Sequence, residues 1–124
     1  PIVYTDMSEP FDATVRTTLI AAAQKLQLPV VTEAVYACTN GPRLETRAEV
    51  RRMTSDGAQV VGMTLVPEVI LAKEIGLHYA AIAVCTNYAA GVGDTRAHDL
   101  HQWRALREQS LTRVEQLLLQ WVTL

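Results

Sequence analysis

The stretch AQVVGMTLVPEVILAKEIGLHYAAIAVCT, residues 58–86, decides the predicted fold. It begins and ends with an apolar run, residues 58–64 and 78–86, and each run has the length and composition of a short buried strand. Between them, Pro67 suits the first turn of a helix and Gly76 suits its end. Apolar strands joined by a helix are typical of a parallel sheet that helices cover. The stretch therefore predicts an α/β fold.

The same alternation of helix and strand extends to both sides of this stretch. Before it, apolar residues at helical spacing predict a helix, a β-branched and aromatic run predicts a strand, and the capping box of Thr46 and Glu49 opens a second helix. After it, a loop with two glycines leads to a long helix with one apolar face. These elements fall at residues 12–27, 30–39, 46–57, 87–95 and 99–124. We expect one domain over residues 1–124, with a mixed, largely parallel sheet flanked by helices.

Composition and charge exclude several classes of protein. The chain has 124 residues, of which 49% are hydrophobic and 19% charged, so it can form one small folded domain. The net charge is −2 and no basic stripe is present, which argues against nucleic acid as a partner. No apolar run reaches the roughly 18 residues of a membrane span, and no signal peptide is visible. We therefore expect a cytoplasmic protein that does not bind a membrane.

The cysteines and the start of the chain support three further expectations. No Cys and His residues have the spacing of a metal site, so no metal ion is expected. Cys38 and Cys85 each end an apolar run, which favours two buried thiols over a disulfide. The chain begins at Pro1 rather than Met, and we expect it to be a piece of something longer.

Polar residues follow each predicted strand, at the edge where ligands bind in parallel sheets. The three strand ends are followed by residues 40–45, 62–64 and 86–89. The carboxylate of Glu45 only accepts hydrogen bonds, whereas the amide of Asn87 both donates and accepts. Together they can recognise a flat heterocycle with a ring N–H beside a carbonyl, which is the pattern of a 6-oxopurine.

Other residues at the same edge suit the rest of such a ligand. Met63 and Leu44 offer apolar or sulfur contacts to a ring or sugar, and Thr64 suits an anion at a strand-to-helix turn. Each candidate also has an ordinary explanation, since Asn87 suits a turn, Met63 a core and Thr64 a helix cap. A glutamate before a helix is most often a solvated charge. The pattern alone therefore predicts an α/β domain with a small-molecule site.

One known family shares three motifs with this chain. The chain resembles the trimeric purine nucleoside phosphorylase and methylthioadenosine phosphorylase family in MSEPFD at residues 7–12, GPRLETRAEV at 41–50 and DGAQVVGMTLVPEVILAKEIGLHYAAIAVCTNYAAG at 56–91. The resemblance runs from about Tyr4 to Gly91 and is weaker in the last helix. It implies phosphorolysis, in which phosphate attacks C1′ of a purine nucleoside and releases the base and a pentose 1-phosphate. It implies no cofactor, with inorganic phosphate as the co-substrate.

The resemblance also implies a role for each candidate residue. Asn87 becomes the catalytic residue, because a donor aimed at N7 and O6 stabilises the negative charge that gathers on the departing purine. Glu45 accepts from purine N1–H, Met63 contacts the ribose and Thr64 contacts the phosphate. Leu44 occupies the position at which relatives place an aromatic ring against the base or sugar.

The choice of base follows from the same resemblance. Relatives specific for 6-aminopurines carry Ser at the position of Glu45 and Asp at the positions of Asn87 and Ala89, so this chain has the 6-oxopurine set. Its loops look most like those of bacterial S-methyl-5′-thioinosine phosphorylases, which act in purine salvage. A general inosine/guanosine phosphorylase and a methylthioadenosine phosphorylase remain alternatives.

The resemblance extends to the quaternary structure and to the 5′ end of the substrate. It implies a homotrimer in which Tyr4 reaches into the sugar site of a neighbouring subunit. The 5′ pocket is expected between His98 and Trp103. A histidine there suits a 5′-hydroxyl, whereas Leu100 and Trp103 suit a thiomethyl group, and the register of this pocket stays open.

Family members are about twice as long as this chain, which resembles the carboxyl-terminal half of the family fold. The amino-terminal half would carry a glycine-rich phosphate loop and an Arg-His pair. We expect the isolated 124-residue chain to be inactive without that half, which a separate chain could supply. The alternative is a non-catalytic fragment that binds purine weakly or serves only as an assembly half.

Overall fold

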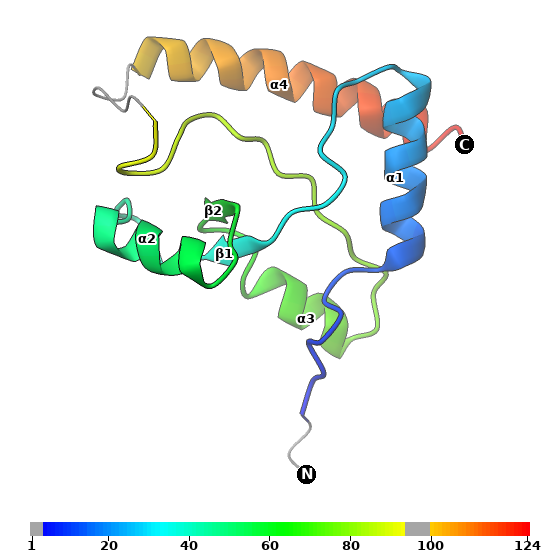
Figure 1. Cartoon of the computed structure of the whole chain (residues 1–124). Coiled ribbons are helices and arrows are strands. Elements are labelled where there is room, and N and C mark those ends of the chain that lie inside the picture. Colours follow the sequence, from blue (N-terminus) through cyan, green and yellow to red (C-terminus); the bar gives the residue numbers. More distant parts are fainter. Residues whose placement is uncertain (1–3, 94–99) are drawn as a thin grey trace.

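The computed structural model describes residues 4–93 and 100–124, without the side chains of residues 100–103. Helices and strands alternate from the first helix to the third, and the predicted α/β class is confirmed (Figure 1). The elements are α1 (Ala13–Lys25), β1 (Tyr36–Cys38), α2 (Arg47–Ser55), β2 (Val60–Gly62), α3 (Glu68–Glu74) and α4 (Leu100–Trp121). Each of these helices lies within the range that the sequence predicts.

The sheet is a parallel pair of three-residue strands, β1 and β2, and α2 connects them (Figure 1). Cys38 lies opposite Gly62 in this pair. One further backbone bond extends the pairing, from the N–H of Thr39 to the carbonyl of Gly62 at 2.9 Å. The strands predicted at residues 30–39 and 58–64 are therefore confirmed in place, but only the segments that run beside each other form strand.

The third predicted strand, residues 78–86, is wrong. The chain has no strand assignment there, and the described sheet contains only β1 and β2. Apolar composition predicts burial, whereas a strand also needs a neighbouring backbone to bond. Ile82 and Val84 accordingly keep 39% and 37% of their surface exposed. A backbone bond of 2.8 Å from Asp12 N–H to the Tyr79 carbonyl ties this segment to the start of α1.

Local signals in the sequence set the helix ends. Asp12 caps α1, because its carboxylate accepts from a backbone N–H of the first turn at 2.8 Å. The predicted capping box of Thr46 and Glu49 is present at the start of α2. Gly57 and Gly76 stand beyond the ends of α2 and α3 with φ of 93° and 70°. Glycine adopts this left-handed conformation without the steric cost that other residues carry.

Among the described residues the buried core is small, and its one cluster joins α1 to α4. α1 packs against α4 through Ala22, Ala23 and Leu117, and the indole N–H of Trp121 donates to the hydroxyl of Thr18 at 2.8 Å. The other buried side chains belong to α2 and α3, and they are Val50, Met53, Val69 and Ala72. Many large apolar side chains remain exposed, among them Val31, Val35, Ile75, Leu119 and Val122.

The two cysteines differ in their surroundings. Both thiols are free, Cys38 at the end of β1 is half-buried, and Cys85 is exposed. The predicted burial is therefore wrong for Cys85, because it lies on the segment that forms no strand. Across residues 4–93 and 100–124, no helix is both long and apolar enough to cross a membrane. The same residues contain no group of three or more His, Cys, Asp or Glu side chains placed to hold a metal ion.

Candidate functional site

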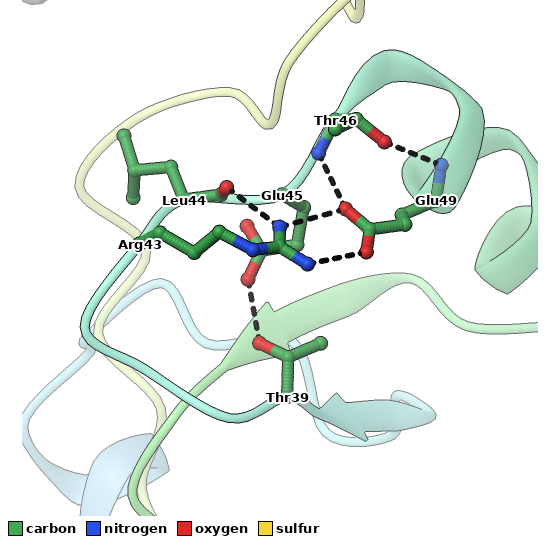
Figure 2. A network of polar contacts seen from close by, with 6 residues as sticks. All are labelled: Thr39, Arg43, Leu44, Glu45, Thr46 and Glu49. Atoms are coloured by element: carbon green, nitrogen blue, oxygen red, sulfur yellow. Dashed lines mark hydrogen bonds and ion pairs between the residues drawn. The ribbon is translucent and has the colours of Figure 1, made fainter.

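The candidate site lies where β1 and β2 end, in the loop that leads from Thr39 to α2 (Figure 2). Near the end of this loop, Glu45 turns back toward the strands. Its Oε1 accepts a hydrogen bond from the hydroxyl of Thr39 at 2.5 Å. Glu45 is half-buried, and the capping box of α2 uses Glu49 instead. The structure thus places an accepting carboxylate at the carboxyl ends of the parallel strands.

Arg43 fixes the shape of this loop. Its guanidinium donates to both carboxylate oxygens of Glu49, at 2.7 and 2.9 Å, and to the carbonyl of Leu44 at 3.1 Å (Figure 2). Glu49 also accepts from the backbone N–H of Thr46 at 2.7 Å. Arg43, two residues before Glu45, and Thr46, directly after it, are therefore both bonded to the carboxylate of Glu49. A bidentate Arg–carboxylate pair has a defined geometry, so this pair limits the positions that Glu45 can take.

These contacts change the acid–base behaviour of Glu49. Hydrogen bonds from Arg43, and then from Thr46, lower the pKa of Glu49 from 4.5 to about 2. The same pair raises the pKa of Arg43. Side-chain exposures of 65% for Arg43 and 39% for Glu49 mean that solvent screens the pair, so its main effect is on loop geometry.

The ion pair gives a prediction about pH. Because the Glu49 pKa is about 2 in the fold and ordinarily 4.5, its stabilising contribution is complete above about pH 4.5 and is lost as the pH falls through about 2. Arg43→Gln removes the largest cause of the lowered pKa, so the Glu49 pKa should rise toward 4.5. Arg52→Gln, elsewhere on α2, should leave it near 2. An NMR titration of the Glu49 carboxyl carbon measures this pKa in both variants. Equal pKa values in wild type and Arg43→Gln would show that Arg43 does not lower the pKa of Glu49.

A mainly polar hollow of about 270 Å³ opens beside Glu45. Its lining comes from the end of β1, the loop and α2, and consists of Cys38, Thr39, Asn40, Arg43, Glu45, Glu49, Arg52 and Met53. Glu49 is engaged by Arg43 and by the capping box. Glu45 has one bonded oxygen, Oε1, and the described residues provide no hydrogen-bond partner for Oε2. Glu45 can therefore accept a further hydrogen bond from a ligand.

Three predicted site residues lie around the same loop. Met63 follows β2 and is half-buried, and a Cβ on Gly41 would lie 2.9 Å from its sulfur, so the loop passes close to Met63. Thr64 is exposed, and Leu44 keeps 51% of its surface exposed. The alternative explanation of Thr64 as a helix cap is wrong, because the N-cap position of α3 is Pro67.

Asn87 lies on a loop that crosses the start of α2. A Cβ on Gly91 would lie 2.9 Å from Cγ of Arg47, the first residue of α2. Asn87 is exposed. Its Oδ1 accepts a hydrogen bond from the hydroxyl of Thr86 at 2.9 Å, and its side-chain nitrogen donates to the backbone carbonyl of Tyr88 at 3.0 Å. Ala89 is half-buried. The loop that carries Asn87 and the loop that carries Glu45 therefore meet at the amino-terminal end of α2.

The remaining candidates are Tyr4 and the residues of the expected 5′ pocket. Tyr4 keeps 89% of its surface exposed, so the described residues of its own chain provide almost no packing for it. His98 lies outside the described residues, as do the side chains of Leu100 and Trp103. The expected 5′ pocket between His98 and Trp103 is therefore not part of the described site.

No pattern in the sequence assigns a role to two residues of the site, Thr39 and Arg43. Arg43 stands six residues before Glu49, outside the helix, so no helical spacing links the two. Thr39 is the last residue of the predicted strand, and a threonine there is ordinary. Both contacts depend on how the loop closes, and no pattern in the sequence predicts that closure.

The chain matches known proteins along nearly its whole length. Residues 1–122 match the family profile described as the phosphorylase superfamily. A protein of Thermodesulfovibrio yellowstonii named a probable S-methyl-5′-thioinosine phosphorylase is 46% identical over 91 residues, which are 73% of this chain and 34% of that protein. The 6-oxopurine nucleoside phosphorylase of Pyrococcus furiosus is 47% identical over 91 residues, with the same two shares of 73% and 34%.

A solved structure shows the same architecture. The methylthioadenosine phosphorylase of Schistosoma mansoni, in complex with adenine, superposes with a TM-score of 0.89 at 30% sequence identity. The match covers 98% of this chain and 48% of that structure. This chain therefore spans about a third of the curated relatives and about half of the solved structure.

Proposed function

Because the chain belongs to the phosphorylase superfamily, we propose that it supplies the base-recognition part of a purine nucleoside phosphorylase. This enzyme, a pentosyltransferase, moves the pentose of a purine nucleoside from the base to phosphate. The observation that carries the proposal is the half-buried carboxylate of Glu45, which Thr39 holds at the ends of the parallel strands. The polar hollow beside it gives a planar ligand access to that carboxylate.

The proposed reaction uses no covalent intermediate and no cofactor. Phosphate attacks C1′ while the bond from C1′ to the purine nitrogen breaks, and the bonding electrons pass to the purine. The purine anion then takes up a proton, which balances the one that hydrogen phosphate loses on forming the pentose 1-phosphate. Asn87 donates toward O6 or N7 and stabilises the charge that develops there. Glu45 accepts from N1–H and orients the base, which reduces the entropy lost in reaching the transition state. Met63, Leu44 and Thr64 contact the ribose, the base or sugar, and the phosphate in this proposal.

The favoured substrate is a 6-oxopurine nucleoside, and S-methyl-5′-thioinosine in particular. Glu45 and Asn87 match a ring N–H beside a carbonyl, and Ala89 adds no carboxylate that would accept from a 6-amino group. The names of the curated relatives support a 6-oxopurine and a 5′-methylthio group. The products are then hypoxanthine and 5-methylthioribose 1-phosphate. General inosine/guanosine or methylthioadenosine phosphorolysis is the alternative.

The rest of the fold comes from a further segment of polypeptide, in the same chain or a separate one. The share of each relative that this chain covers supports this proposal. So do large apolar side chains that the described residues leave uncovered, such as Val31 and Ile75, which are 87% and 73% exposed. Without that segment, the chain is a non-catalytic fragment that binds purine weakly.

The proposed experiment uses a hybrid enzyme, in which this chain replaces the segment that it matches in the T. yellowstonii relative. The hybrid enzyme should release hypoxanthine from methylthioinosine only when inorganic phosphate is present. Inosine and methylthioadenosine, assayed alongside, test the 5′ substituent and the base. Release at the same rate without phosphate would indicate hydrolysis and contradict the proposed reaction.

We also propose that the enzyme is a homotrimer in which Tyr4 reaches into the sugar site of a neighbouring subunit, and this arrangement gives a prediction. Tyr4→Ala in the hybrid enzyme should raise KM for nucleoside by roughly 3- to 10-fold, the value of one aromatic contact. Its melting temperature should stay unchanged, because Tyr4 is 89% exposed on its own chain. Tyr88→Ala is the matched control for stability, because it truncates another tyrosine that keeps 67% of its surface exposed. An unchanged KM, or a structure with Tyr4 packed on its own subunit, would rule out this role.

A further inference from the structure

We propose that Thr39 is a positioning residue for base recognition, which acts by orienting the carboxylate of Glu45. This inference rests on the proposed function, because it concerns how Glu45 accepts from the purine. Thr39 itself touches no reacting atom in this account. Its hydroxyl sets which oxygen of Glu45 faces the ligand.

The first observation is that Thr39 has a fixed place. Its backbone N–H donates to the carbonyl of Gly62 at 2.9 Å, directly after the last paired residues of β1 and β2. A side chain on Gly62 would collide with the Tyr36 ring, since a Cβ there would lie 1.8 Å from the Tyr36 oxygen. The strand ends are thus closely packed, and the backbone bond to Gly62 holds Thr39 in register with the sheet.

The second observation is the direction of the Thr39 hydroxyl. It has one hydrogen and two nearby acceptors, Glu45 Oε1 at 2.5 Å and the Gly62 carbonyl at 3.5 Å. The shorter contact takes the hydrogen, because hydroxyl hydrogen bonds are typically near 2.7 Å and weaken with distance. The bond to Glu45 is therefore the one that the Thr39 hydroxyl makes (Figure 2).

The third observation concerns the other oxygen of Glu45. Oε1 accepts from Thr39, while the described residues give Oε2 no hydrogen-bond partner. A carboxylate accepts hydrogen bonds at both oxygens and donates none. Oε2 is then ready to accept from a ring N–H and unsuited to an unprotonated ring nitrogen. Thr39 therefore contributes to base discrimination as well as to affinity.

Removing the hydroxyl without changing the shape tests this role. In the hybrid enzyme, Thr39→Val should raise KM for methylthioinosine by about 10-fold or more, the usual value of a hydrogen bond to a charged group. The selectivity over methylthioadenosine should fall in parallel, with KM for phosphate unchanged. Thr39→Ser keeps the hydroxyl and should restore KM to within about 3-fold of wild type. Thr54→Val, which removes a hydroxyl bonded within α2, is the matched control and should change none of these values.

A double-mutant cycle separates this inference from the proposed function. In the Glu45→Gln background, Thr39→Val should raise KM for methylthioinosine by a smaller factor than it does in the unchanged hybrid enzyme, since both changes disturb the same interaction. If Glu45→Gln abolishes base selectivity but Thr39→Val leaves KM unchanged, the positioning role is overturned and the proposed function stands. If Thr39→Val and Thr39→Ser raise KM for phosphate and nucleoside equally and lower the melting temperature, Thr39 has only a structural role. If Glu45→Gln changes neither selectivity nor KM, the assigned base recognition itself is wrong.

Discussion

The substitutions Glu45→Ser, Asn87→Asp and Ala89→Asp should together shift the hybrid enzyme from methylthioinosine toward methylthioadenosine, by about 100-fold or more in relative kcat/KM. In the unchanged site, the unprotonated N1 of adenine faces the carboxylate of Glu45, so two acceptors meet without a hydrogen between them. Each group left unpaired in this way costs about 1–3 kcal/mol. Two new aspartates can instead accept from the 6-amino group and share a proton with N7.

The single substitutions should mostly lose activity, because each one breaks the old pattern without completing the new one. The measurement is kcat/KM for both nucleosides in the unchanged hybrid enzyme, the three single variants and the triple variant. Glu33→Ser, at an exposed glutamate before β1, is the matched control and should leave the ratio unchanged. A triple variant that keeps its 6-oxopurine preference would show that Glu45 and Asn87 do not recognise the base.

The 124-residue chain by itself should turn over no nucleoside, whereas the hybrid enzyme should be active. Thr64, an exposed hydroxyl, is the phosphate contact proposed for this chain, and a single hydroxyl does not orient a dianion. Orientation of a nucleophile supplies about 7 kcal/mol or more of the barrier. Its loss corresponds to a rate lower by about 10⁵-fold.

Intact mass must first establish that the assayed material is the 124-residue chain alone. Phosphate-dependent hypoxanthine release is then followed for this chain, for the hybrid enzyme, and for the chain mixed with the part of the T. yellowstonii relative that it does not match. Activity that returns on mixing would support a separate chain as the partner. Robust phosphorolysis by the verified chain alone would contradict the proposal that the phosphate site lies elsewhere.

Local signals in the sequence predict the helices well. The capping box of Thr46 and Glu49 and the glycines Gly57 and Gly76 act through neighbouring backbone groups, so the sequence alone contains the relevant interactions. The prediction of a strand at residues 78–86 is wrong for the opposite reason. Its apolar residues predict burial, but the ladder depends on a neighbouring strand that no local pattern contains.

The candidate site likewise has one feature that the sequence predicts, the place of Glu45, and one that it does not, the contacts that hold Glu45. Parallel strands bring their carboxyl ends to one edge, so the place of Glu45 follows from the order of strand and helix. The contacts that hold Glu45, from Thr39 directly and from the pair of Arg43 and Glu49 around it, depend on how one loop closes over the strands. Those contacts join residues at irregular spacing, and only the three-dimensional structure reveals them.

The most direct test is the base preference of the unchanged hybrid enzyme, measured as kcat/KM for methylthioinosine and for methylthioadenosine at saturating phosphate. A site built to pair a polar group discriminates against the analogue that lacks it by about 10⁴-fold or more. If Glu45 accepts from N1–H and Asn87 donates toward O6 or N7, methylthioinosine should be preferred by that order. Equal values for the two nucleosides, or a preference for methylthioadenosine, would contradict the account.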